Sequence, residues 1–193
     1  DLAKARQHYQ TVLDTRPDFQ PAFIQLAMLD AREGKEQAML GQLEQALSAD
    51  PDRIQPRLLL ARYYLGKGRP EQVAPLFANL DKAQQQSPEV LRLMALAQLS
   101  SKDSAAAQFT LEQLLDSTPD TAQVRHMMAM AAAGSGDVER TEQELRRALE
   151  LDDNYVPSRI ALARLAFNRG STEEFAEHLA KRKTLAPDQP EVL

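Results

Sequence analysis

Arginine shows the clearest chemical pattern in this sequence. Eight arginines and only two acidic residues fall in five windows, 19–32, 53–66, 87–100, 121–134 and 155–168, which together carry a net charge of +6. The whole chain carries −5, so the acidic excess lies outside these windows. The planar guanidinium group matches the paired oxygens of a carboxylate or phosphate. The pattern therefore indicates anion binding.

Residue types that support catalysis or metal binding are dispersed. His8, His126 and His178 form no ligand pair, and the chain has no cysteine. The methionines of 127–130 beside His126 are soft ligands, but methionines at helical spacing are more typical of packing. The sequence contains no phosphate-binding glycine loop and no nucleophile motif. We predict that the chain is not an enzyme and that it has no catalytic residue, metal or cofactor.

A period of 34 residues, counted from Pro17, positions the five windows. Alanine recurs ten residues after each start, a turn residue seventeen after it and a large apolar residue twenty-six after it. Self-similarity at a fixed period of this length indicates a helical solenoid. The alanines are Ala27, Ala61, Ala95, Ala129 and Ala163, the turn residues are Gly34, Gly68, Lys102, Gly136 and Gly170, and the apolar residues are Leu43, Phe77, Leu111, Leu145 and Leu179.

Each period is expected to form two helices, with the arginine windows as the first helices, and no strand pattern is present. The predicted fold is all-α, a single array over 1–193. Within it, 1–16 is the second helix of a truncated repeat and 187–193 begins a further helix. In one second helix, predicted at 70–82, Pro75 is expected to introduce a kink. The five full repeats are predicted at 17–50, 51–84, 85–118, 119–152 and 153–186.

The 34-residue helix-turn-helix period, with a small residue, a large apolar residue and a closing proline at these offsets, resembles the tetratricopeptide repeat (TPR) family along the whole chain. The resemblance implies a right-handed superhelical α-solenoid. First helices would line a concave groove and second helices the convex back. It also implies binding of other proteins. We therefore expect a non-enzymatic protein–protein interaction scaffold whose groove binds an extended, acidic partner segment.

The resemblance also separates the arginines into a helix-pairing group and a groove-facing group. Arg57, Arg125 and Arg159 fall at its helix-pairing position, where an aliphatic stem packs on the neighbouring helix and the guanidinium stays at the surface. The binding candidates are the charged residues at groove-facing positions and the apolar residues beside them. They are Arg62, Arg92, His126, Arg164, Leu58, Leu59, Leu93, Leu96, Met127 and Met130, with Ile24, Met28, Ile160 and Phe167 as further apolar candidates.

Two other functions stay open. The runs at 58–62 and 160–164, each ending in Ala-Arg, resemble bacterial TPR proteins of exopolysaccharide and PEP-CTERM loci. That resemblance implies a component of exopolysaccharide assembly or secretion at the cell envelope, with an anionic polysaccharide as partner and the periplasm, rather than the bacterial cytoplasm, as location. An accessory domain of a larger enzyme is the other alternative. The net charge argues against nucleic acid as partner, and no apolar run reaches the ~20 residues that span a bilayer.

Overall fold

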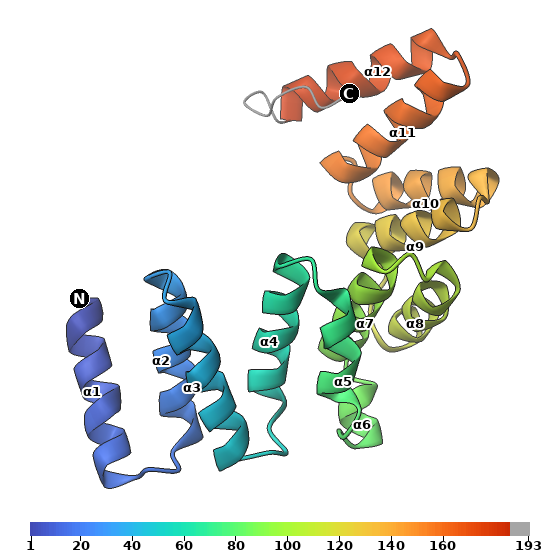
Figure 1. The fold of residues 1–193 in the computed structure, drawn as a ribbon. Coiled ribbons are helices and arrows are strands. Elements are labelled where there is room, and N and C mark those ends of the chain that lie inside the picture. Colours follow the sequence, from blue (N-terminus) through green and yellow to red (C-terminus); the bar gives the residue numbers. More distant parts are fainter. Residues whose placement is uncertain (186–193) are drawn as a thin grey trace. The chain divides into compact units, whose positions relative to one another are not determined.

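The computed structural model describes residues 1–185, all of whose regular elements are helical (Figure 1). The chain divides into two compact units, Asp1–Leu93 and Met94–Leu193, with the boundary inside one helix. The all-α prediction is confirmed, whereas the repeat boundaries remain a prediction. The predicted helix start at 187–193 lies outside the described residues. None of the helices described within 1–185 is both long and apolar enough to cross a bilayer.

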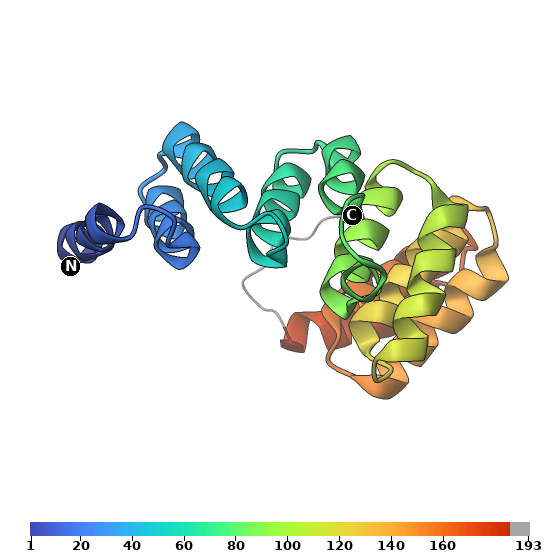
Figure 2. The ribbon, with the colours of Figure 1, turned by 90° about the horizontal axis from the view of Figure 1, so that it is seen from below.

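The N-terminal unit begins with four long helices that lie side by side in chain order (Figures 1 and 2). Helices α2 and α3 form a hairpin, and α1 and α4 pack on either side of it. Three short elements follow before α7 starts. The bounds are α1 Leu2–Thr15, α2 Gln20–Arg32, α3 Glu36–Ala49, α4 Ile54–Gly66, η1 Pro70–Gln72, α5 Val73–Phe77, α6 Lys82–Gln85 and α7 Pro88–Ser100.

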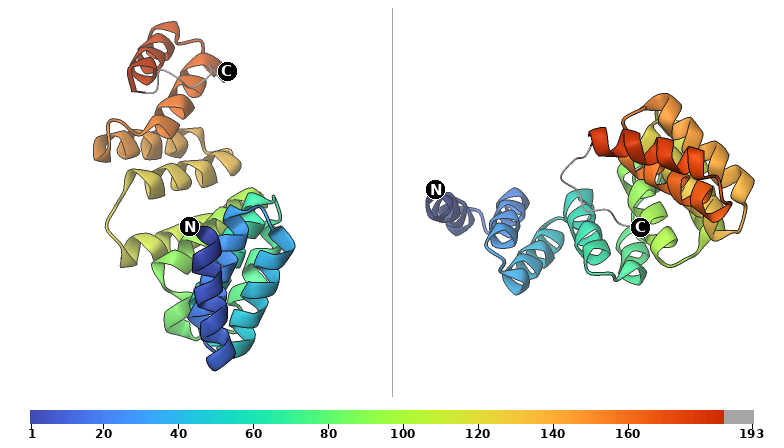
Figure 3. Two further views of the ribbon diagram at one scale, coloured as in Figure 1. Left: turned by 90° about the vertical axis from the view of Figure 1, so that its left-hand side faces the viewer. Right: turned by 90° about the horizontal axis from the view of Figure 1, so that it is seen from above.

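The C-terminal unit contains the remaining helices, in which α9 pairs with α10 and α11 with α12 (Figure 3). Helix α8 also packs on α9, and α10 packs on α11. Asp103 and Asp137 cap α8 and α10, since their carboxylates accept hydrogen bonds from the backbone N–H groups of Ala106 and Arg140. The bounds are α8 Ser104–Ser117, α9 Ala122–Gly134, α10 Val138–Leu151, α11 Val156–Asn168 and α12 Thr172–Leu185.

The second helix predicted at 70–82 is broken rather than kinked. A 3₁₀ turn leads into α5, which ends two residues after Pro75, and α6 starts only at Lys82. Proline lacks the N–H that would continue the helix, and its ring crowds the carbonyl four residues earlier. Carbonyl groups that the break leaves without helical partners are bound by Gln85: its side-chain amide donates hydrogen bonds to the carbonyls of Leu80 at 2.9 Å and Ala78 at 3.3 Å. Other repeats have proline at this position, as at Pro17, Pro51 and Pro119.

All five predicted turn residues adopt positive φ, between +60° and +78°. At each turn the residue after the turn residue donates its N–H to a carbonyl five residues earlier, as in Asp103 to Gln98 at 2.9 Å. This hydrogen bond satisfies a carbonyl at the end of the first helix, as in a Schellman motif. Glycine adopts positive φ without steric cost. Lys102 is the one non-glycine residue with positive φ in the described part of the chain.

We expect Lys102→Gly to raise the free energy of unfolding by about 1 kcal/mol, because glycine removes the Cβ clash of the left-handed region. The reciprocal change Gly136→Lys, one repeat later, should lower it by a similar amount. Urea denaturation of both variants measures the two values. A loss of stability in Lys102→Gly would show that the lysine side chain makes a contribution larger than the backbone strain.

The recurring alanines and large apolar residues build the same core cluster in each unit. In the N-terminal unit Ala27, Leu43 and Leu60 pack together, and in the C-terminal unit Ala129, Leu145 and Leu162 do so. Each member of the second cluster lies three periods after its counterpart. All five alanines of the series are buried, at 4% exposure or less. A small residue therefore lies where helices approach closely, and a large one fills the space between neighbouring repeats.

Candidate functional site

The three arginines at the helix-pairing position are bound within the protein. Arg57 donates to the carbonyls of Leu76 at 2.7 Å and Pro51 at 3.0 Å. Arg159 is 2% exposed and donates to the backbone carbonyl and carboxylate of Asp153. Arg57 and Arg125 fit the predicted helix-pairing role, because they donate to Leu76 on α5 and to Glu144 on α10, whereas Arg159 donates to Asp153 in the loop before its own helix. The expectation of a surface guanidinium is wrong for Arg159, because its whole side chain is enclosed and its charge is neutralised by the preceding loop.

Arg125 makes the strongest of these contacts. It forms two parallel hydrogen bonds of 2.8 Å with the carboxylate of Asp120 and a third, of 3.1 Å, with Glu144 on α10. The guanidinium of Arg125 holds the pKa of Asp120 below its usual value. The side chain of Glu144 is half-buried against Arg125. Whether an arginine is bound within the protein therefore depends on its position in the repeat.

Arg62, Arg92 and Arg164, the predicted binding arginines, differ from the helix-pairing group. Among the residues that the structure describes, none of the three has an ion pair or a side-chain hydrogen bond. Arg62 and Arg164 are exposed, and Arg92 is half-buried. The Nε of Arg92 is buried without a hydrogen-bond partner among the described residues, as are those of Arg57 and Arg159, so it does not distinguish the two groups. A guanidinium without an internal partner is free to bind an external anion. Arg62 and Arg92 belong to the N-terminal unit and Arg164 to the C-terminal unit.

The predicted apolar groove residues differ in exposure. Leu58, Leu93 and Met127 are buried and belong to the core. Leu59 and Leu96 are half-buried, whereas Met130 is 48% exposed. Of the further candidates, Ile24 is buried and Ile160 half-buried, while Met28 and Phe167 are exposed. Exposure differs even at one repeat position, since Leu59 is half-buried and Leu93, one period later, is buried.

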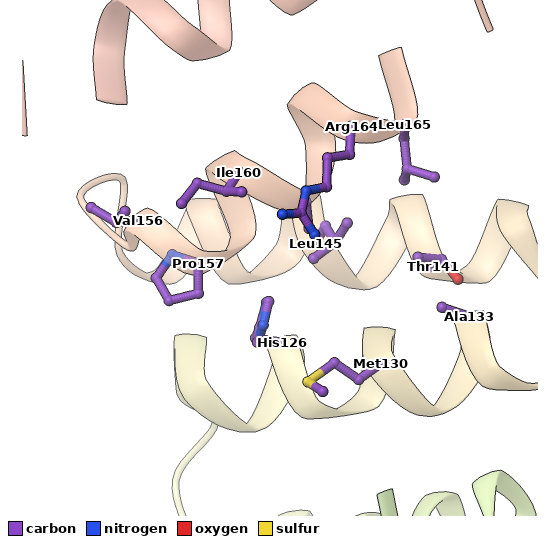
Figure 4. A pocket seen from close by; sticks show the side chains of 11 residues that line it. His126, Met130, Ala133, Thr141, Leu145, Val156, Pro157, Ile160, Arg164 and Leu165 are labelled. Atoms are coloured by element: carbon purple, nitrogen blue, oxygen red, sulfur yellow. The ribbon is translucent and has the colours of Figure 1, made fainter. Parts of the chain in front are cut away.

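In the C-terminal unit, an open pocket of about 620 Å³ brings several of these residues together (Figure 4). Helix α9 supplies His126 and Met130, and α11 supplies Ile160 and Arg164, whose side chain extends from α11 towards α9. None of the described residues that line it is acidic. The full lining is His126, Met130, Ala133, Thr141, Leu145, Val156, Pro157, Ile160, Ala161, Arg164 and Leu165.

His126 connects two repeats at one side of this pocket. Its Nδ1 lies 3.1 Å from the hydroxyl oxygen of Ser158, which is fully buried in the first turn of α11. The imidazole also packs edge-on against Tyr155, with ring centroids 5.7 Å apart. Burial lowers the pKa of His126, so the imidazole is neutral at pH 7. At that pH Arg164 is the charged side chain among the residues that line the pocket.

The lowered pKa makes stability depend on pH. The pKa of His126 is lower in the folded protein than in the unfolded chain, where it is about 6.5. Neutral His126 therefore makes its full contribution to the free energy of unfolding above about pH 6.5, and that contribution is lost as the pH falls towards the pKa of the folded protein. We expect the wild type to lose more stability between about pH 7 and pH 5 than His126→Gln. Thermal unfolding at several pH values measures the difference. His178, whose pKa burial also lowers, acts in both proteins, so it cancels in the comparison.

Sequence reasoning missed Ala133 and Thr141, which line the pocket. A signal was present, since the position of Ala133 holds Leu65, Leu99 and Phe167 in three of the other four full repeats, and Ala31 in the first. One small residue where neighbouring repeats have large ones predicts space between helices. The pocket arises at positions whose residue type does not recur with the 34-residue period.

Paired antiparallel helices with equivalent clusters at a fixed period define an α-helical repeat scaffold. The family model for the tetratricopeptide repeat matches residues 33–97 and 64–131, which together cover just over half of the chain. The chain belongs to the tetratricopeptide repeat family. Repeats of this kind stack into extended surfaces that bind other proteins.

Solved structures show the same fold. The chain superposes on PilW, a type IV pilus biogenesis factor, with a TM-score of 0.82 and 14% identity, covering 98% of this chain and 88% of PilW. MamA from Desulfovibrio magneticus RS-1 gives a TM-score of 0.73 at 15% identity, with 89% and 97% covered. TTC0263, a TPR protein from Thermus thermophilus, gives 0.66 at 22% identity, with 88% and 93% covered.

A curated relative is the cellulose synthase operon protein C of Komagataeibacter sucrofermentans. It is 29% identical over 124 residues, a match that covers 64% of this chain and 9% of the relative. The chain therefore corresponds to a small part of that protein.

Proposed function

We propose that this chain is a non-catalytic protein-binding module whose first helices bind extended acidic segments of a partner protein. The observation that carries the proposal is the division among its arginines. Arg57, Arg125 and Arg159 are held by internal hydrogen bonds, whereas Arg62, Arg92 and Arg164 on the same set of helices have no partner among the described residues. Each unit thus presents arginine on a first helix that is available to a carboxylate.

The charge distribution supports an acidic partner. The first-helix windows carry +6 in a chain of net charge −5, although Arg53, Arg125 and Arg159 are paired with carboxylates outside the windows. The remaining unpaired arginines attract an acidic segment, and the acidic remainder of the chain repels it. Carboxylates suit the unpaired guanidinium groups because two N–H donors meet two oxygens. Apolar side chains that lie beside the arginines, such as Leu59 and Met130, add contact area for the partner's own apolar residues.

The test measures binding of three fluorescent peptides of equal length, one rich in glutamate, one rich in lysine and one rich in glutamine. We expect the glutamate peptide to bind, with an affinity that falls as salt is added. Arg62→Glu combined with Arg92→Glu should reduce that affinity by about tenfold or more, because two attractive contacts become repulsive.

Circular dichroism verifies that the double variant remains folded, and Arg62→Gln with Arg92→Gln provides a milder pair if it does not. Equal affinity for the three peptides, or undiminished binding by both double variants, would dismiss the proposal.

The likeness to cellulose synthase operon protein C favours a second candidate, a component of exopolysaccharide assembly or export. In that function the unpaired arginines would contact an anionic polysaccharide. A capture experiment that offers acidic glycans and acidic peptides in competition separates the two candidates. Preference for the glycan, lost in the double variant, would establish the second one in place of the first.

A further inference from the structure

We infer that the pocket between α9 and α11 accepts an aliphatic side chain of the partner segment, and that Arg164 binds a carboxylate close to it. This inference rests on the proposed function and specifies it. The segment recognised by the C-terminal unit then combines a leucine, isoleucine or methionine with a neighbouring aspartate or glutamate. The acidic residues of the segment would provide its attraction to the arginines, and its aliphatic residue would fix its position in the pocket.

The first argument is the origin of the space. Ala133 and Thr141 line the pocket, and the equivalent positions one repeat later hold Phe167 and Phe175. Those two rings contact each other, with centroids 5.5 Å apart. The same molecule thus shows these two positions occupied by large side chains in one repeat and by small ones in the preceding repeat. Larger side chains at positions 133 and 141 would extend into the volume that the small Ala133 and Thr141 leave open.

The second argument is the chemistry of the lining. Met130, Ile160 and Leu165 present apolar surface, and no acidic side chain lies among the described residues of the pocket. A volume of about 620 Å³ falls within the range of pockets that bind small ligands. Arg164 extends over this apolar surface, as Figure 4 shows, and has no internal partner among the described residues. Apolar walls beside one unpaired cation complement an aliphatic group beside one anion.

The variant that tests the pocket can be taken from the chain itself. Ala133→Phe introduces the side chain found one repeat later, and Ala133→Leu introduces the one found at Leu65 and Leu99. Ala133 is exposed, so both variants are expected to fold. Each should close the pocket while the arginines remain in place. Arg164→Gln removes the cation and leaves the pocket open.

The measurement compares two peptides of equal charge, one of glutamate and leucine and one of glutamate and serine. We expect the wild type to bind the leucine peptide about tenfold more tightly, since burial of an aliphatic side chain adds to the attraction. Ala133→Phe and Ala133→Leu should remove this preference and keep the affinity for the serine peptide. Arg164→Gln should weaken binding of both peptides.

The outcomes separate the inference from the function on which it rests. Equal binding of the two peptides by the wild type, or a preference that survives both Ala133 variants, overturns the inference and leaves the acidic-segment function standing. Failure of both peptides to bind overturns both.

Discussion

Leu145→Ala is expected to lower the free energy of unfolding by about 2–5 kcal/mol, the cost of lost burial and of a residual cavity. Leu145 is 1% exposed and packs on Ala129 of α9 and Leu162 of α11, so it joins two repeats. In a helical repeat protein the stability of each repeat depends on the interface with its neighbour. Loss of Leu145 should therefore weaken the C-terminal unit as a whole. Urea denaturation followed by circular dichroism measures the effect.

Val138→Ala on the same helix is the control, since Val138 is 61% exposed. Its expected cost is within about 0.5 kcal/mol. Similar losses for the two variants would mean that the 34-residue register places the wrong face of α10 in the core.

Arg6→Ala should destabilise the N-terminal unit by about 3 kcal/mol, because it leaves a buried carboxylate without its partner. Arg6 on α1 lies 2.7 Å from Asp30 on α2, whose side chain is 2% exposed. Neither carboxylate oxygen of Asp30 has an aligned hydrogen bond among the described residues, so the ion pair compensates its charge. The loss should appear as faster hydrogen exchange in α1 and as a lower urea midpoint.

Adding Asp30→Ala to Arg6→Ala should recover most of that loss. Two of the four positions equivalent to Asp30 hold buried alanines, Ala132 and Ala166, and the other two hold Tyr64 and Gln98, so the repeat accommodates alanine there. The double-mutant cycle isolates the coupling between the two residues. A double variant no more stable than Arg6→Ala would indicate that Arg6 acts through packing or through Glu33, at 3.0 Å, and not through Asp30.

Much of the fold was predictable because equivalent positions in each repeat make the same packing contacts. The positions of Ala27 and Leu43 recur with the same burial at Ala129 and Leu145, and the turn position requires positive φ even where it holds Lys102. The break after Pro75 was only partly predictable. The sequence indicates a lost hydrogen bond at Pro75, but it does not show the end of α5 at Phe77 or the hydrogen bonds that the Gln85 side chain donates to the carbonyls that follow.

The candidate site was less predictable. The different roles of Arg57 and Arg62 could be predicted from their positions in the repeat: Arg57 lies between helices and donates to Leu76, whereas Arg62 is exposed to solvent. Burial of Leu58 and Met127 did not follow from their spacing, since the spacing does not show which neighbouring helices cover them. The pocket depends on Ala133 and Thr141 together. Alanine also occurs at one of the two equivalent positions in other repeats, at Ala31 and at Ala107, so neither position alone identifies the pocket.

The most direct test of the central claim compares two triple variants with the same loss of charge. One is Arg62→Gln, Arg92→Gln and Arg164→Gln, and the other changes three exposed cations away from the first helices to glutamine: Lys4, Arg69 and Lys82. Affinity for the glutamate peptide should fall about tenfold or more in the first variant and remain near that of the wild type in the second. An equal fall in both would contradict the claim, because net charge alone would then account for binding.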